Sequence, residues 1–308
     1  MTFTERMRRV SRHRVASAAI KTVLYIMLIN FAFIFVFPFL YMVVNSLKSN
    51  TDLYDPTVNW IPKVIWVNNY HLANVSLKYS RYFWYSLRIT VIPTLGHLVS
   101  CSLIGYGFAR YEFPGKRILF FMIIVAMIVP VQTIIIPQYM LFNNLGWINS
   151  LMPFYATSFT GFGLKGALFI YLFIQYFKGL PKELEEAAYV DGCGFLMTFA
   201  RIVLPLAQSI FIVTIVLSMV WHWNDFYEPG IYLLRADLYV LPARLQSIAN
   251  MVNQPTEEML AMMDDMSMIN NGVLMAGTAM VIAPVIFAFG FLQRRFIQGI
   301  ERAGLSGE

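Results

Sequence analysis

Six apolar stretches, separated by polar segments, set the pattern of hydrophobic and polar positions along the chain. They are residues 22–44, 82–109, 118–141, 151–177, 206–223 and 272–292. A transmembrane helix needs about 20 consecutive, mostly apolar residues. The pattern therefore predicts an all-α, polytopic membrane protein with six transmembrane helices.

The first stretch follows a basic segment, residues 1–21, in a layout that secretory signal peptides share. The apolar region of a signal peptide is about 7–15 residues long and is followed by a small-residue cleavage site. Residues 22–44 form a longer run without such a site. They are therefore predicted to be the first span.

Composition supports the membrane interpretation. Hydrophobic residues make up 58% of the chain and charged residues 13%, whereas roughly 25% charged residues are expected of a soluble domain. The net charge of +6 would also suit nucleic acid, but the basic residues lie mostly at the ends of the apolar stretches. We therefore expect membrane lipid and no nucleic acid as a partner. Cys101 and Cys193 are too few for a disulfide framework.

Lysines and arginines are shared unevenly between the two sides that six spans would define. The side with both termini and residues 178–201 carries fifteen of them, and the other side carries seven. Cytoplasmic segments carry the excess of basic residues. Both termini (N-in/C-in) and the segment between the fourth and fifth spans are therefore predicted to be cytoplasmic.

That segment, residues 181–205, has the pattern of two short amphipathic helices joined by a turn. Pro181 suits the first turn of a helix, and Glu183–Ala188 are good helix formers. Asp191–Gly192 should end this helix, because glycine readily takes left-handed turn geometry. A second helical run, Phe195–Val203, follows. A segment of this kind between two spans is suited to docking a partner.

The 181–205 segment also carries a specific motif. Glu186–Ala188, three residues, Gly192, nine residues and Ile202–Pro205 follow the pattern EAA-x3-G-x9-I-x-L-P. This resembles the cytoplasmic signature loop of the membrane subunits of bacterial binding-protein-dependent ABC importers.

Three further segments resemble the sugar-importing branch of that family, in particular the second, six-span permease of the maltose type. They are Gly107–Lys116, Pro137–Tyr139 and Trp221–Phe226. The resemblance implies three regions: residues 1–81 with the first span, residues 82–299 as the permease domain, and residues 300–308 as a cytoplasmic tail.

The resemblance implies a multi-pass permease subunit in the bacterial cytoplasmic (inner) membrane, importing a sugar or oligosaccharide. Its implied partners are ATP-binding cassette subunits, a second homologous permease and an extracytoplasmic solute-binding protein. Residues 186–188 would dock on the ATPase, Gly192 would give the turn, and Leu204–Pro205 would tie the segment to the fifth span. The implied ATPase-coupling residues are Glu185, Glu186, Ala187, Ala188, Asp191, Gly192, Ile202, Leu204 and Pro205.

The sequence carries no motif for chemistry of its own. It has no G-x-x-x-x-G-K-[ST] phosphate loop, no H-E-x-x-H, no G-x-S-x-G and no C-x-x-C. Its four histidines have no metal-ligand spacing. We therefore expect no catalytic residue, no cofactor and no metal, and we expect ATP hydrolysis in a separate subunit.

Lys165 is a lone charge within the predicted fourth span. A charge in a span is costly and usually faces a cavity or a partner, so Lys165 could line the translocation path. Alternatively, the span begins later and Lys165 extends to the interface. His97 could be a neutral histidine bonded to a neighbouring helix or part of a proton relay.

Two alternative classes are an ion-coupled secondary transporter or channel subunit, with these two residues as ion-linked groups, and a purely structural membrane scaffold. The 181–205 segment favours the importer over both classes. The predicted outer loop, residues 224–271, carries acidic residues and methionines. It could contact a solute-binding protein or lie as a helix on the spans.

Overall fold

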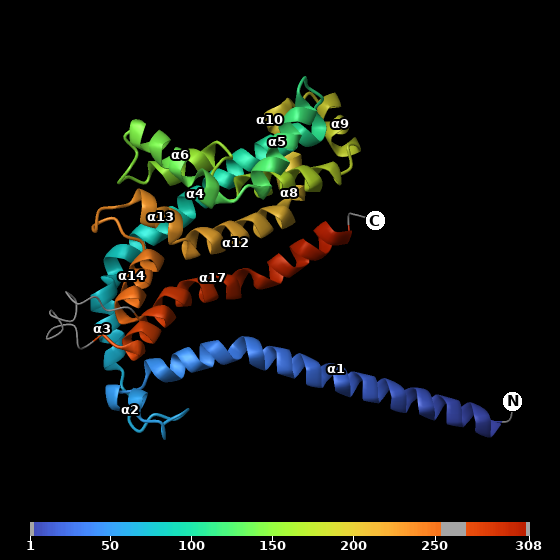
Figure 1. Cartoon of the computed structure of the whole chain (residues 1–308). Coiled ribbons are helices and arrows are strands. Elements are labelled where there is room, and N and C mark those ends of the chain that lie inside the picture. The colour runs from blue at the N-terminus through green and yellow to red at the C-terminus, as the bar shows by residue number, and fades with distance from the viewer. Residues whose placement is uncertain (1–2, 254–268, 306–308) are drawn as a thin grey trace. The chain divides into compact units, whose positions relative to one another are not determined.

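The computed structural model describes residues 3–253 and 269–305, and every regular element within them is helical (Figure 1). This confirms the predicted all-α class. The described residues form two compact units. One unit contains residues 3–73 and 269–279, and the other contains residues 74–253 and 280–305. The methionine-rich residues 259–268 of the predicted outer loop lie outside the described residues.

The first unit begins with the long helix α1 (Phe3–Ser46), followed by α2 (Asn50–Tyr54) and the start of α3 (Asn68–Leu77). The amino-terminal turns of α17 (Asn271–Leu305) also belong to it. Asn69 of α3 fixes the end of α1, because its Nδ2 donates hydrogen bonds to the carbonyl oxygens of Ser46 (2.9 Å) and Lys48 (2.8 Å).

The second unit is built around α4 (Tyr79–Arg110), which packs against α7 (Met152–Phe159), α8 (Gly166–Lys178) and α12 (Gln208–Asn224). Glycine allows the closest of these contacts. A Cβ atom at Gly96 would lie 2.9 Å from Ser158 Cβ of α7, and one at Gly105 would lie 2.5 Å from Phe173 Cβ of α8. Small residues at such crossings let membrane helices approach each other closely.

The two ends of α4 lie in different apolar clusters. Towards its carboxyl end, Tyr106 packs with Phe173 and Phe177 of α8. Near its amino end, Ile89 packs with Tyr232, and the Tyr82 hydroxyl donates to the carbonyl oxygen of Ala236 (2.6 Å). An α-helix rises about 1.5 Å per residue. The 32 residues of α4 therefore separate these ends by roughly the thickness of a membrane.

Three helices of the described residues are long and apolar enough to cross a membrane. They contain Ile20–Ser46, Tyr79–Arg110 and Asn271–Gln298. These match the predicted first, second and sixth spans. The predicted fifth span corresponds to α12, which is bent by 79° from the preceding helical run, Phe195–Leu206.

The predicted third and fourth spans are not continuous helices. The third divides into α5 (Lys116–Ile128) and α6 (Val131–Asn144), which meet at 105°. Pro130 lies at this break, where it has no N–H to donate and holds the preceding residue in an extended conformation. The fourth divides into α7 and the 13-residue α8, joined by a turn that contains Gly161 at φ +76°. The structure thus places a break within each of the apolar stretches 118–141 and 151–177, for which the sequence predicts one span each.

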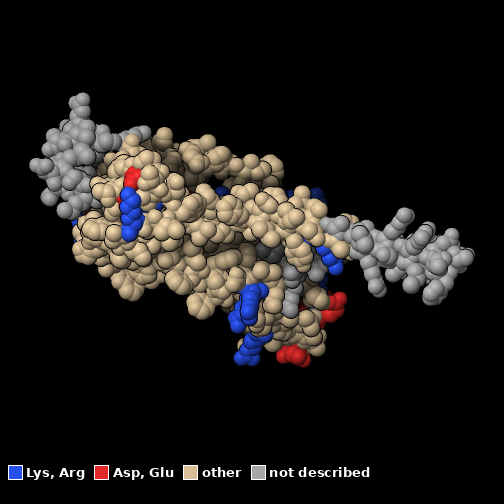
Figure 2. Space-filling view, turned by 90° about the horizontal axis from the view of Figure 1, so that it is seen from below, with Lys and Arg blue, Asp and Glu red and all other residues tan. Residues whose placement is uncertain are grey.

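The predicted outer loop is also more ordered than a single loop. Its described part contains α13 (Tyr227–Tyr232) and α14 (Leu241–Asn253). Charged side chains occupy only a small part of the face shown in Figure 2, most of which is uncharged. That distribution fits the low charge content of the chain. The count of six spans and the N-in/C-in orientation stay predictions.

Candidate functional site

The 181–205 segment folds as two short helical pieces joined by a tight turn. The first is α9 (Glu183–Val190), whose first turn holds three glutamates that complement the positive end of the helix dipole. Gly192 has φ +82°, which confirms the predicted glycine turn. The second piece runs through α10 (Phe195–Thr198), the π-helix η1 (Phe199–Val203) and α11 (Leu204–Leu206).

A buried ion pair fixes α9 to the carboxyl end of α4. Arg110 Nη2 lies 2.6 Å from Glu185 Oε1, and Arg110 Nε donates to the same oxygen at 2.7 Å. The Tyr106 hydroxyl donates to Glu185 Oε2 at 2.7 Å. The side chains of Arg110 and Glu185 are only 5% and 7% exposed. Charge-assisted bonds of this kind are short and strong, so they hold α9 at a defined place on α4.

The aromatic ring of Tyr106 extends the same attachment to the second piece of the segment. It packs against Phe195 of α10 and Phe199 of η1, with ring centroids 5.3 and 5.1 Å apart. Tyr111 follows α4 directly, and its hydroxyl shares a 2.7 Å hydrogen bond with the hydroxyl of Tyr189 on α9. Both pieces of the segment are therefore fixed to one helix.

The opposite surface of the segment is exposed and partly apolar. Its exposed large side chains are Leu184 (45%), Val190 (88%), Leu196 (67%) and Met197 (45%). Glu186, Ala187, Asp191 and Gly192 are exposed with them. We call this set of residues the outward face. An exposed apolar surface on a polar segment is typical of an interaction site.

The structure divides the residues that the resemblance assigned to ATPase coupling. Ala188 is buried and packs inside the segment, whereas its neighbours Glu186 and Ala187 are exposed. Glu185 is also buried, in the pair with Arg110. Ile202 and Leu204 are half-buried and Pro205 is exposed, close to the bend that leads into α12.

Lys165 is not inside a helix, which corrects its predicted position in the middle of a span. It directly precedes α8, with a left-handed backbone (φ 61°), and its side chain is exposed. Its Nζ lies 5.8 Å from the centroid of the Trp221 ring on α12, which is within the range of a cation–π interaction. Lys165 thus lies in the turn that joins α7 to α8.

Next to the turn between α7 and α8, α4 and α12 share a cluster of buried polar side chains. Ser218 Oγ lies 3.0 Å from Thr94 Oγ1, 3.2 Å from His222 Nδ1 and 3.5 Å from His97 Nδ1. The rings of His97 and His222 are 5.2 Å apart. His97 therefore contacts a neighbouring helix, as expected of a histidine that is bonded between two helices.

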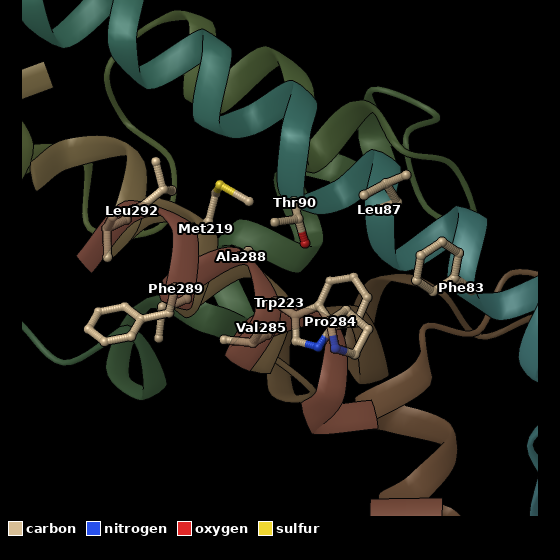
Figure 3. A pocket seen from close by; sticks show the side chains of 12 residues that line it. Phe83, Leu87, Thr90, Met219, Trp223, Pro284, Val285, Ala288, Phe289 and Leu292 are labelled. Atoms are coloured by element: carbon tan, nitrogen blue, oxygen red, sulfur yellow. The ribbon is translucent and has the colours of Figure 1, made fainter. Parts of the chain in front are cut away.

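A separate apolar pocket lies between α4, α12 and the carboxyl part of α17 (Figure 3). Phe83 and Thr90 of α4 face it together with Trp223 of α12 and Pro284 of α17. The Thr90 hydroxyl donates to the carbonyl oxygen of Ser86, so it does not offer a free polar group to the pocket. Neither Lys165 nor the 181–205 segment lines this pocket.

Two carboxylates lie at the far end of the second unit, after α12. Asp225 Oδ1 accepts hydrogen bonds from the backbone N–H groups of Tyr227 (2.9 Å) and Glu228 (3.3 Å). Burial raises the pKa of Asp225 above its usual range despite these two bonds. Burial and the charge of Asp225 raise the pKa of Glu228 to about 8. In the described chain, neither carboxylate belongs to a salt bridge.

Sequence reasoning did not identify Arg110 and Tyr106 as partners of Glu185. A signal for Arg110 was present, because it lies in the turn at Gly107–Lys116 that resembles the sugar-importing branch. No local signal marks Tyr106, because its role depends on which side of α9 meets α4.

Curated relatives match almost the whole chain. The arabinooligosaccharides transport system permease protein AraQ of Bacillus subtilis (strain 168) is 29% identical over 303 residues, covering 96% of this chain and 99% of AraQ. The probable starch degradation products transport system permease protein AmyC of Thermoanaerobacterium thermosulfurigenes is 30% identical over 264 residues, covering 85% of this chain and 89% of AmyC.

Among solved structures, a bacterial ABC transporter involved in the import of the acidic polysaccharide alginate has a chain with the same fold. The TM-score is 0.76 at 22% identity, and the match covers 91% of this chain and 98% of that one. The model of the family "Binding-protein-dependent transport system inner membrane component" matches residues 102–302. This range includes the carboxyl end of α4, the 181–205 segment and α12, and the chain belongs to this family of inner membrane transport components.

Proposed function

We propose that this chain is the membrane-spanning permease subunit of an ATP-driven importer of a sugar or oligosaccharide. In this role it does not hydrolyse ATP. A separate ATP-binding cassette subunit binds the outward face and supplies the energy. The transported class rests on the relatives, which are named for arabinooligosaccharides and starch degradation products.

The observation that carries the proposal is the two-sided character of the 181–205 segment. One side is fixed to α4 by the buried pair of Arg110 and Glu185. The other side is the exposed outward face, with Val190 at 88% and Leu196 at 67% exposure. A force applied to the outward face would therefore reach α4 through a short, charge-assisted contact.

Family membership supports two further partners, a second homologous permease and a solute-binding protein. The helix α1 offers a surface for such pairing. Its membrane-spanning part, Ile20–Ser46, has none of its apolar window buried. An apolar helix of this kind is suited to lipid or to the spans of a second permease.

We place Lys165 on the translocation path. The side chain is exposed at a break between helices and close to Trp221. A lysine that faced only lipid would be costly, whereas a water-filled path would solvate it. Lys165→Met should lower the rate or the affinity of transport while leaving the amount of folded protein unchanged. Unchanged transport kinetics in that variant would remove Lys165 from the path.

Co-purification tests the ATPase contact. The tagged chain is purified in mild detergent, and the bound subunits are identified by mass and assayed for ATP hydrolysis. Leu196→Asp on the outward face should lose the ATP-hydrolysing subunit. The matched control is Leu234→Asp, the same substitution at a side chain that is 56% exposed near the opposite end of α4. It should retain the subunit.

Three results would contradict the proposal. The wild-type chain could be recovered without an ATP-hydrolysing subunit. Leu196→Asp could retain the subunit as fully as the control does. The chain alone could perform ion-driven transport after reconstitution, which would instead support the ion-coupled class, with Lys165 and His97 as its ion-linked groups.

A further inference from the structure

The segment of residues 60–67, in the first unit, presents an apolar surface that the proposed transport cycle does not use. Its sequence is Trp-Ile-Pro-Lys-Val-Ile-Trp-Val, within an otherwise polar connection. Six of its side chains are large, apolar and exposed: Trp60 (45%), Ile61 (83%), Val64 (61%), Ile65 (67%), Trp66 (44%) and Val67 (63%). Contiguous exposed apolar side chains mark a protein or membrane interaction site.

The segment folds back along α1. At one end, the backbone N–H of Trp66 donates to the carbonyl oxygen of Leu47, one residue beyond α1, at 2.8 Å. At the other end, the Trp60 ring packs edge-on against the Phe37 ring, with centroids 5.3 Å apart. Ten residues of helix correspond to about 15 Å along the axis. Trp60 therefore contacts α1 well inside the helix, not at its end.

Polar contacts hold the backbone next to this segment. The buried Lys48 donates from Nζ to the carbonyl oxygens of Val58 (3.0 Å) and Asn59 (2.8 Å). Lys63, the only charged residue of the segment, is paired with Asp55 at 2.6 Å. The ammonium groups of Lys48 and Lys63 are thus bonded to protein oxygens, whereas the apolar side chains of residues 60–67 are exposed.

We propose that residues 60–67 insert into the interfacial layer of the lipid bilayer, at the membrane surface that α1 reaches with its carboxyl end. Continuity with α1 identifies phospholipid as the partner. Phe37 lies within the span Ile20–Ser46, so the ring that packs on it is at the depth of the bilayer. The hydrocarbon core is about 30 Å thick, whereas a helix of 27 residues is about 40 Å long. Trp66, bonded to Leu47 just beyond the end of the helix, lies at the headgroup level that tryptophan side chains favour.

Depth-dependent quenching tests this insertion. An environment-sensitive fluorophore is attached at Ile61→Cys or Ile65→Cys, in a Cys193→Ser background that keeps the buried Cys101. The full-length permease, with its co-purifying subunits, is placed in nanodiscs whose lipids carry a spin label near the headgroup or deep in the acyl chain. The matched control is His71→Cys, at an exposed polar position of α3 in the same unit.

At positions 61 and 65, we expect emission shifted to the blue relative to position 71. We also expect a larger loss of intensity with the shallow spin label than with the deep label or with aqueous iodide. Quenching mainly by iodide would show a water-exposed segment and overturn the proposal. Protection from both lipid labels and iodide would show that a protein partner covers the segment, which would overturn it equally. The readout does not depend on transport, so it separates this proposal from the function proposed above.

Discussion

The two ends of the second unit place carboxylates beside opposite kinds of neighbour. At the carboxyl end of α4, Glu185 is paired with Arg110 and also accepts a hydrogen bond from Tyr106. At the other end, Asp225 and Glu228 lie close together without a salt bridge in the described chain, and the pKa of each is raised. Glu185 is buried beside a cation, whereas Asp225 and Glu228 are half-buried beside each other. The neighbours therefore distinguish a fixed attachment from a protonatable site.

This difference fits the coupling role proposed for the carboxyl end of α4. An attachment that transmits force must keep its geometry throughout the cycle, and the ion pair of Glu185 supplies that geometry. Asp225 and Glu228 instead respond to pH, because their protonation changes their mutual repulsion.

The largest effect should follow from Arg110→Met. The substitution leaves Glu185 buried without its cation, and breaking a buried ion pair in this way costs about 3–5 kcal/mol. We expect a marked fall in thermal stability in detergent and a loss of ATP-driven transport. Fluorescence-detected unfolding and uptake into proteoliposomes would measure the two effects.

The double variant Arg110→Met, Glu185→Met separates stability from coupling. Replacing both members of a buried pair with apolar side chains of similar size is often neutral for stability. We expect stability to return towards that of the wild type, while ATP hydrolysis remains poorly coupled to uptake. Full recovery of coupled transport in the double variant would show that the ion pair does not transmit force.

Gly192→Val should have a smaller effect on stability and a large effect on coupling. A Cβ at this position meets no atom within 4 Å, so the strain comes only from φ +82°. A left-handed conformation costs a non-glycine residue roughly 1–2 kcal/mol. The turn should open and change the angle between α9 and α10, so that ATP hydrolysis continues without uptake. Normal uptake at normal ATP consumption would refute the role of this turn.

The 181–205 segment also shows what the sequence could and could not predict. Local propensity was enough to predict its two helical pieces and the glycine turn between them. The burial of Glu185 does not follow from it, because Glu183 and Glu186 are equally acidic and belong to the same turn of α9. Only the rotation of α9 against Arg110, 75 residues earlier in the chain, distinguishes the three glutamates.

The spans show the same limit. Hydropathy identifies residues 118–141 and 151–177 as apolar stretches, and most of their residues are helical in the structure. It does not predict where an apolar run bends, because a proline inside a membrane helix can be tolerated when neighbouring groups satisfy the backbone. Pro93 lies inside the continuous helix α4, whereas Pro130 lies at a 105° break. The two prolines differ in their tertiary surroundings, which a single sequence does not display.

The smallest effect, and a direct test of the protonatable end, is expected from Glu228→Gln. The folded-state pKa of Glu228 is raised from 4.5 to about 8, so the folded protein binds this proton more tightly than the unfolded chain does. The stabilisation is therefore complete at acidic pH and is lost as the pH rises from about 4.5 towards about 8. Glutamine keeps the size of the side chain but does not titrate. The unfolding temperature of the variant should thus fall less than that of the wild type across this range.

Glu186→Gln is the matched control, because it removes the same charge from an exposed side chain on α9. It should leave the pH dependence of unfolding close to that of the wild type. If Glu228→Gln left the wild-type slope unchanged as well, Glu228 would not hold its proton in the folded state. The two ends of the unit would then differ only in their hydrogen-bonding partners, because protonation would no longer distinguish Glu228 from the ion-paired Glu185.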